Sequence, residues 1–169
     1  LPISTGEPIR KASIPERLIL PLKQHIGSPA HLLVAAGDRV LKGQVLAAPA
    51  GRISAPIHAP TSGTVIEITE HEIPHPSGLR APCIMIETDG KDEWASLAAP
   101  LPNWSELDAE ALIDRIRDCG IVGLGGATFP SSVKLEHRGQ AIDTLIINGA
   151  ECEPFITCDD MLMREHADR

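Results

Sequence analysis

The residues best suited to chemistry begin with a glycine cluster between positions 120 and 135, which reads GIVGLGGATFPSSVKL. Gly123, Gly125 and Gly126 would let backbone N–H groups approach an anion closely. Pro130 suits the first turn of a short helix, whose amino end favours phosphate, and Lys134 follows about one turn later. The cluster is neither a Walker loop nor a standard G-x-G-x-x-G fingerprint, so on its own it equally suits a purely structural turn.

A second group of polar residues follows an apolar run. Residues 143–148 (DTLIIN) predict a buried strand, of the parallel kind, and Asn148 stands at its end. Glu151 and Glu153 are two apart, so they would share one side of an extended segment. Because open α/β sheets bind ligands at strand ends, these three polar side chains are candidates for a ligand site.

The elements that would position both groups begin after a proline-rich linker at residues 100–102. An apolar stripe predicts a helix from about Asp108 to Cys119, with Ser105 and Asp108 as candidate N-caps and Gly120 as the C-cap. Helix, glycine loop and buried strand together predict that residues 105–169 hold the start of an α/β domain, Rossmann-like and truncated.

The first hundred residues have a different pattern, with short apolar runs between proline and glycine residues. Their lengths suit strands, and turn residues such as Gly37-Asp38 and Asp89-Gly90 separate them. The predicted strands are Arg17 to Leu22, Ala30 to Val34, Val45 to Ala48, Thr64 to Ile68 and Cys83 to Glu87. Residues 14–99 are therefore expected to form a small β-sandwich or barrel, and the whole chain to be of the α+β class.

Two segments of this β-rich part resemble biotinyl and lipoyl domains, which are barrel-sandwich hybrids. Residues 34–46 resemble their G-D-x-V-x-x-G-Q-x-L segment, and residues 53–65 their A-P-x-x-G-x-V segment. We expect Gly37 and Gly43 in tight turns, and Val40, Val45 and Leu46 facing inward. Carriers hold their cofactor on a Lys between the two segments, but residues 47–52 contain none. A structural or docking barrel is therefore expected.

Composition excludes several classes of function. The formal net charge is −8, and the only aromatic residues are two Trp and two Phe, which argues against nucleic-acid binding. No apolar run approaches the roughly 18 residues needed to cross a bilayer, so any membrane role is expected to be peripheral. The chain has no initiator Met and no signal-peptide pattern, so we expect a piece of a longer polypeptide.

Other residues with reactive side chains have simpler interpretations. The four cysteines form no C-x-x-C pair, and Cys83 and Cys119 are expected to be buried free thiols. Cys152 adjoins Glu151, where a reactive thiol is conceivable. His71 and His75 are four apart, but Pro74 and Pro76 predict a solvated loop instead of a metal-binding helix face.

The two polar groups together resemble the NADH- and FMN-binding subunit of respiratory complex I. There a G-x-G-G-A-G-F-P loop with a following Lys precedes N-A-D-E-S-E-P, and here residues 123–130, Lys134 and residues 148–154 correspond. The resemblance is closer to the RnfC (RsxC) family of the ion-translocating Rnf electron transport complex. Its L-I-I-N-x-A-E-C-E-P-x-I-T-x-D-D pattern matches residues 145–160, and its barrel-sandwich segment likewise comes first.

The resemblance implies a set of site residues. Gly123, Gly125, Gly126 and Lys134 would shape the FMN loop; Asn148, Glu151 and Glu153 would line the flavin and nicotinamide pocket, with the two glutamates as catalytic candidates. There is no metal site in this set. Thr128 replaces the loop's last Gly, so it would be strained if the backbone needs positive φ, or its hydroxyl would bond phosphate. Ala150 replaces the Asp of complex I, which removes one hydrogen bond to flavin.

The resemblance also implies a function and a setting. The parent protein would be an NADH/ferredoxin oxidoreductase and part of a translocase, using FMN and NAD(H), with [4Fe-4S] iron–sulfur clusters whose ligands lie outside these residues. Its partners would be other Rnf subunits and, indirectly, ferredoxin or flavodoxin, without nucleic acid. It would be a peripheral membrane protein at the cytoplasmic face of the bacterial inner membrane. The alternative is a non-catalytic docking module of the same complex. We expect the fragment alone to be inactive.

Overall fold

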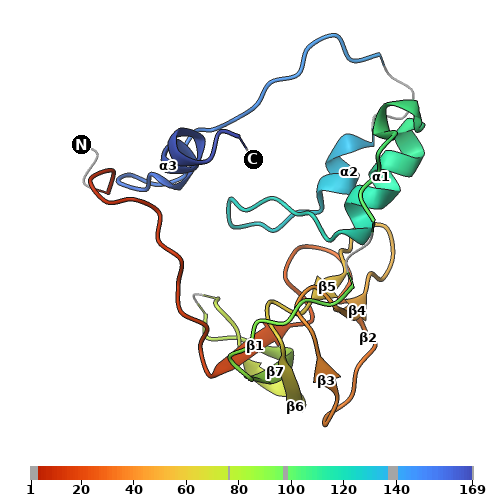
Figure 1. Cartoon of the computed structure of the whole chain (residues 1–169), viewed down its shortest axis with the longest axis vertical. Coiled ribbons are helices and arrows are strands. Elements are labelled where there is room, and N and C mark those ends of the chain that lie inside the picture. Colours follow the sequence, from red (N-terminus) through yellow and green to blue (C-terminus); the bar gives the residue numbers. More distant parts are fainter. Residues whose placement is uncertain (1–3, 76, 97–98, 137–140, 169) are drawn as a thin grey trace. The chain divides into compact units, whose positions relative to one another are not determined.

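The structure, a computed structural model, describes residues 4–75, 77–96, 99–136 and 141–168 (Figure 1). The chain divides into two compact units. Residues 14–136 form one unit, and residues 1–13 together with 137–169 form the other. The strands and the first two helices belong to the larger unit, and the third helix to the smaller one.

The β-rich part of the larger unit consists of two antiparallel sheets. The four-stranded sheet has the order β1 (Arg17–Pro21), β7 (Arg80–Thr88), β6 (Gly63–Glu72) and β3 (Arg39–Val40). The three-stranded sheet has the order β2 (His31–Leu32), β4 (Val45–Ala48) and β5 (Ile57–His58). Each of the five strands expected from the sequence is confirmed, and β3 and β5 are additional two-residue strands.

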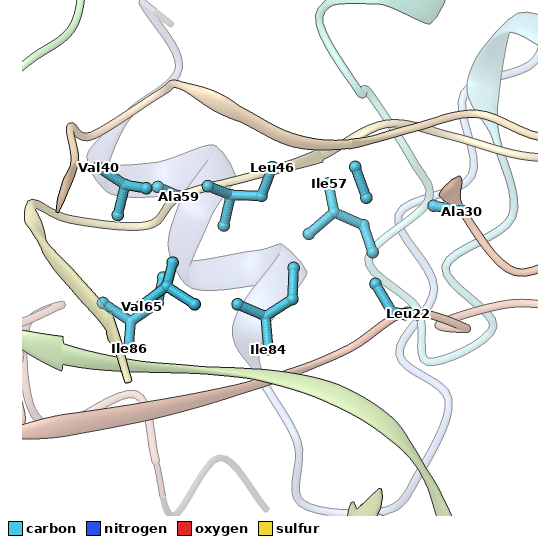
Figure 2. Close-up of a cluster of buried hydrophobic side chains, with 10 residues drawn as sticks. Leu22, Ala30, Val40, Leu46, Ile57, Ala59, Val65, Ile84 and Ile86 are labelled. Atoms are coloured by element: carbon cyan, nitrogen blue, oxygen red, sulfur yellow. The ribbon is translucent and has the colours of Figure 1, made fainter. Parts of the chain in front are cut away.

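The hydrophobic core lies between these two sheets. Leu46 of β4 and Ile57 of β5 point toward Ile84 and Ile86 of β7 (Figure 2), and all four are at least nine-tenths buried. The remaining members of the cluster are Leu22, Ala30, Val40, Ala47, Ala59 and Val65. Because both sheets contribute apolar side chains to one interior, this part of the chain closes its own core.

The two segments that resemble biotinyl and lipoyl domains pair with each other. Ala59 N–H donates to the Gln44 carbonyl and Gly43 N–H to the Ala59 carbonyl, both at 2.8 Å, while β3 pairs with β6. Gly37 and Gly43 have φ of 96° and 80°, as the expected tight turns require. The interlocked halves expected from the sequence are thus confirmed.

One detail of that expectation was wrong. Val40 and Leu46 face inward and are fully buried, but Val45 is 37% exposed. Adjacent residues of a strand point to opposite faces, so Val45 and Leu46 could not both enter the core. Gly63 opens β6 where a Cβ would overlap the Glu87 carbonyl oxygen, which explains the glycine after Ser62.

The helical part of the larger unit follows the linker. It comprises the 3₁₀ turn η1 (Trp104–Glu106) and the helices α1 (Ala109–Asp118) and α2 (Ser131–Leu135), which lie side by side (Figure 1). Asp108 is the N-cap of α1, and its carboxylate accepts the Ala111 N–H at 2.7 Å. Gly120, with φ of 67°, follows the C-cap Cys119. The predicted helix is confirmed.

The smaller unit contains the one prediction of secondary structure that failed. Residues 143–148 form no strand, and Leu145, Ile146 and Ile147 are about four-fifths exposed. A parallel strand needs a neighbouring strand on at least one edge, and no described residue pairs with this segment. The described part of the smaller unit has one helix, α3 (Cys158–Glu165). A Rossmann-like sheet is therefore absent from the described residues.

No helix among the described residues combines the length and the apolar character that a membrane span requires.

Candidate functional site

The glycine loop is a closed hairpin between α1 and α2. Its base is held by hydrogen bonds from Gly123 N–H to the Phe129 carbonyl and from Ser131 N–H to the Ile121 carbonyl, both at 2.9 Å. Its tip is open to solvent, and Leu124 is 89% exposed. The backbone is therefore fixed at the base while the glycine-rich tip, with Gly125, faces outward.

Two glycines of the loop have distinct structural reasons. A Cβ on Gly123 would lie 2.7 Å from Nζ of Lys134, so the lysine side chain folds back over the loop. Gly126 has φ of 98°, a conformation that side chains disfavour, and a Cβ there would meet open space. The predicted proximity of Lys134 to the loop is confirmed, and the space beside Gly126 admits a ligand.

Thr128 has the unusual backbone that the sequence suggested. Its φ is 46°, so a β-branched residue occupies the left-handed region. Its hydroxyl donates to the carbonyl of Gln24, which lies between β1 and β2. The expected positive φ is confirmed. The hydroxyl proton is used within the protein, which ties the loop to the barrel.

The barrel also fixes the start of the loop. A Cβ on Gly120 would lie 2.9 Å from two ring atoms of His58 and 3.2 Å from the Pro56 carbonyl oxygen. Burial lowers the pKa of His58, and a hydrogen bond to the Asp118 carbonyl opposes this effect. A neutral imidazole therefore lies against the end of α1, and only glycine fits at position 120.

A third contact involves the hairpin that carries the cofactor Lys in biotinyl and lipoyl domains. Here Arg52 stands in that stretch and pairs with Glu136, just after α2, at 2.6 Å. Arg117 of α1 approaches the same carboxylate at 3.8 Å. The carrier position is thus used for an internal ion pair, consistent with the expected structural barrel.

The second group of predicted site residues lies in the smaller unit. Asn148 is exposed, and its Oδ1 accepts the Ala150 N–H at 3.0 Å in a local turn. Glu151 is half-buried, whereas Glu153 is exposed. The polar residues of this segment are therefore accessible, except for the carboxylate of Glu151.

The Glu151 carboxylate caps helix α3. Its Oε1 accepts the N–H groups of Asp159 and Asp160 at 2.9 and 3.1 Å, and Oε2 accepts from Sγ of Cys158 at 3.2 Å. An anion at a helix amino end satisfies donors that the helix cannot pair itself. The sequence had suggested a ligand role for Glu151; the structure shows a structural bond for each of its oxygens.

The cysteines differ from one another. Cys83 is buried, as expected, and burial raises the pKa of its thiol. Cys119 is exposed, so its predicted burial was wrong; it is the C-cap of α1, beyond the apolar stripe. Cys152 and Cys158 are also exposed, and the hydrogen bond to Glu151 raises the pKa of Cys158 and favours its unreactive thiol form.

One group of side chains has metal-ligand chemistry. Ligand atoms of Glu151, Cys158 and Asp159 lie within 4.8 Å of one another. The glutamate already caps α3 and the thiol is bonded to it, so both have structural work. The two histidines behave as the prolines suggested: His71 ends in strand β6, and His75 follows in a turn.

Sequence reasoning missed the residues by which the barrel holds the loop. Gln24, Arg52 and His58 lie 60 or more residues before their partners. Nothing in their local sequence marks them, because each acts only through a long-range contact. Among the predicted residues, the structure groups Gly123, Gly125, Gly126 and Lys134 in the larger unit; Asn148, Glu151 and Glu153 belong to the smaller one.

The fold and the loop define a class of protein: a barrel-sandwich hybrid followed by part of a flavin-binding domain. Residues 2–91 match the family described as the RnfC barrel sandwich hybrid domain, and residues 116–169 match the Nuo51 FMN-binding domain. The chain belongs to the RnfC family.

Curated relatives agree along almost the whole chain. The RnfC-type protein of Serratia proteamaculans, named as the C component of an ion-translocating oxidoreductase complex, is 51% identical over 98% of this chain. The proteins of the same name in Pseudomonas aeruginosa and Salmonella gallinarum are 53% and 50% identical, each over 97% of the chain. The alignments cover only 21–24% of these relatives, so the chain spans about a quarter of their length or less.

Proposed function

We propose that this chain is the amino-terminal part of an electron-transfer subunit that uses FMN and NAD(H) within an ion-translocating oxidoreductase complex. The single observation that carries the proposal is the match of residues 116–169 to an FMN-binding domain, on a loop whose glycines leave open space for a ligand. The names of the relatives supply the complex. The two domains would be residues 14–99 and 105–169.

The residues fit a phosphorylated flavin at the loop. Gly123, Gly125 and Gly126 would present backbone to the cofactor, and Lys134 would place a positive charge beside its phosphate or ring. When bound, FMN supplies the hydride and single-electron chemistry. The protein's contribution is position and field: the hydrogen-bonded base of the loop and its attachment to Gln24 hold the tip in place.

Asn148, Glu151 and Glu153 are proposed for the second half of the pocket. Asn148 would bond the flavin, and Glu153 is accessible to orient a nicotinamide. Glu151 can take part if its bonds to α3 are exchanged for bonds to ligand, which its two carboxylate oxygens allow. Iron–sulfur clusters, exchange with ferredoxin or flavodoxin, and a position at the cytoplasmic face of the inner membrane belong to the same proposal for the longer subunit.

The test uses the longer subunit, purified with FMN and titrated anaerobically with NADH. We expect bound flavin whose visible absorbance bleaches. Lys134→Gln should weaken FMN binding about tenfold, the loss of one charge-assisted contact. Lys91→Gln removes the same charge from a loop at the end of β7 and serves as the control. A longer subunit that holds no flavin and does not respond to NADH would contradict the proposal.

A second candidate function is a docking module without catalysis. The observation in its favour is that the carrier hairpin holds Arg52 in an ion pair instead of a cofactor Lys. The same titration separates the two functions. Retained flavin that bleaches with NADH excludes docking as the only role.

A further inference from the structure

A groove in the larger unit lies between the barrel and the tip of the glycine loop. It encloses about 760 Å³, within the range of ligand pockets, and Gly126 and Thr128 form its wall on the loop side. The barrel side comes from the β1–β2 connection, residues 23–26, and from the turn of the β6–β7 hairpin. We call it the basic groove, for the reason that follows.

The side chains of the groove are all neutral or positive. Lys23 and Arg80 contribute permanent charges, and His25 and His75 lie alongside. None of its described lining residues is Asp or Glu, although the chain has 23 acidic residues and a net charge of −8. A local excess of positive charge on an acidic protein concentrates anions.

The basic side chains are partly pre-positioned. Arg80 donates from Nη2 to the Glu70 carbonyl at 2.6 Å, which uses one of the guanidinium donors. His25 Nδ1 lies 2.8 Å from the Ile26 carbonyl, and His75 Nδ1 accepts the Ser77 N–H at 3.2 Å. Glu72 stands opposite Arg80 in the β6–β7 ladder, but it does not line the groove, and the described residues show no ion pair between them.

The rest of the lining is apolar. Ile26, Ile73 and Leu79 line the groove, and Ile26 and Leu79 are 73% and 50% exposed. An inorganic anion would leave this surface in water. A molecule with both an aromatic ring and a phosphate would cover it while pairing with the charges.

We infer that the basic groove binds the phosphate-bearing part of a nucleotide, with Lys23 and Arg80 as phosphate partners and the aliphatic residues against its ring. This inference deepens the proposed function, on which it rests for the identity of the nucleotides, FMN or NAD(H). It gives the barrel a direct part in ligand binding, beyond holding the loop. It also places the phosphate next to the open side of Gly126.

The experiment is an NMR titration of the 169-residue chain with three probes: FMN, NADH, and riboflavin, which lacks the phosphate. We expect amide shifts at residues 23–26, 79–81 and 126–128 with FMN or NADH, and binding that weakens with added salt. Whichever of the two gives the shifts is the source of the phosphate. Riboflavin should bind at least tenfold more weakly than FMN if FMN is the ligand.

Variants make the test specific. Lys23→Gln and Arg80→Gln should each raise the Kd of the responding nucleotide about threefold to tenfold and leave riboflavin unaffected, whereas Lys91→Gln should change neither. Equal Kd values for the groove and control variants, or shifts confined to other residues, would overturn the inference. Flavin bleaching in the longer subunit with no effect of Lys23→Gln removes the groove and leaves the proposed function standing. Groove shifts without bleaching have the opposite meaning.

Discussion

The barrel and the segment at residues 143–148 have similar apolar sequences and opposite environments. Leu46, in strand β4, is fully buried between two sheets, whereas Leu145 is 79% exposed. Strand β4 has β2 on one side and β5 on the other; residues 143–148 pair with no described strand. An apolar run therefore specifies burial only when other segments supply the hydrogen bonds and the facing side chains.

The glycine loop is intermediate between these two regions. Its base is hydrogen bonded and attached to the barrel through Thr128, and its tip is exposed. The complete barrel can thus hold a ligand loop in a defined place. The contrast between a closed core and an open segment can be tested by matched substitutions.

The largest expected effect comes from Leu46→Ala. It removes a fully buried side chain between the sheets and should lower the free energy of unfolding by about 2–5 kcal/mol. Leu145→Ala is the same substitution at an exposed site and should change it by less than about 0.5 kcal/mol. Chemical denaturation followed by circular dichroism measures both.

A milder pair keeps this comparison measurable if Leu46→Ala does not fold. Ile84→Val should cost about 0.5–1.5 kcal/mol and Ile146→Val close to nothing, because Ile84 is fully buried and Ile146 is 82% exposed. Equal losses for the buried and the exposed members of each pair would mean that residues 143–148 are packed in solution.

The next effect concerns the junction between barrel and loop. Gly120→Ala places a Cβ against His58 and the Pro56 carbonyl, at a φ of 67°, and should lower the free energy of unfolding by about 1–3 kcal/mol. Gly37 has φ of 96° but open space around its Cβ position, so Gly37→Ala carries the backbone cost alone, roughly 1 kcal/mol. Thermal unfolding of both variants separates contact from strain.

A Gly120→Ala variant no less stable than Gly37→Ala would contradict the close approach of His58 to the end of α1. The readout is the difference between the two melting temperatures. Both variants bear the same chemical change, so the effect of glycine on the unfolded chain cancels.

Much of the fold could be predicted, and the reasons are local. Short apolar runs between turn residues gave the five longer or central strands, and Asp108 and Gly120 gave the limits of α1. Strands β3 and β5 have two residues each, too few for a period to show. Residues 143–148 were misjudged because an apolar run says nothing about whether a partner strand is present.

The candidate site was predictable in a similar, partial way. The glycines and Lys134 are marked by composition and spacing, and a positive φ at Thr128 followed from the glycine it replaces. The capping of α3 by Glu151 and the contact of Gln24 with Thr128 depend on how distant segments fold together. The basic groove has the same origin, since Lys23 and Arg80 are 57 positions apart and meet only in the folded barrel.

The smallest effect expected is a pH dependence that comes from His58. Burial lowers its pKa in the folded protein, whereas the unfolded chain binds a proton near the ordinary value of about 6.5. Below that value the unfolded chain takes up more protons than the folded one, so stability is full above it and falls as the pH drops toward the lower folded pKa. His58→Gln keeps an N–H donor for the Asp118 carbonyl and has no charge to gain.

The measurement compares melting temperatures at about pH 7.5 and pH 5.5, on either side of the ordinary histidine pKa. The wild-type chain should lose more stability between the two than His58→Gln does, because only the wild-type chain must keep a half-buried imidazole neutral. His31→Gln, at an exposed position in β2, is the control and should behave as the wild type. An identical loss in His58→Gln and in the wild type would mean that the imidazole is open to water. The barrel would then hold the start of the glycine loop less closely than the Gly120 contact implies.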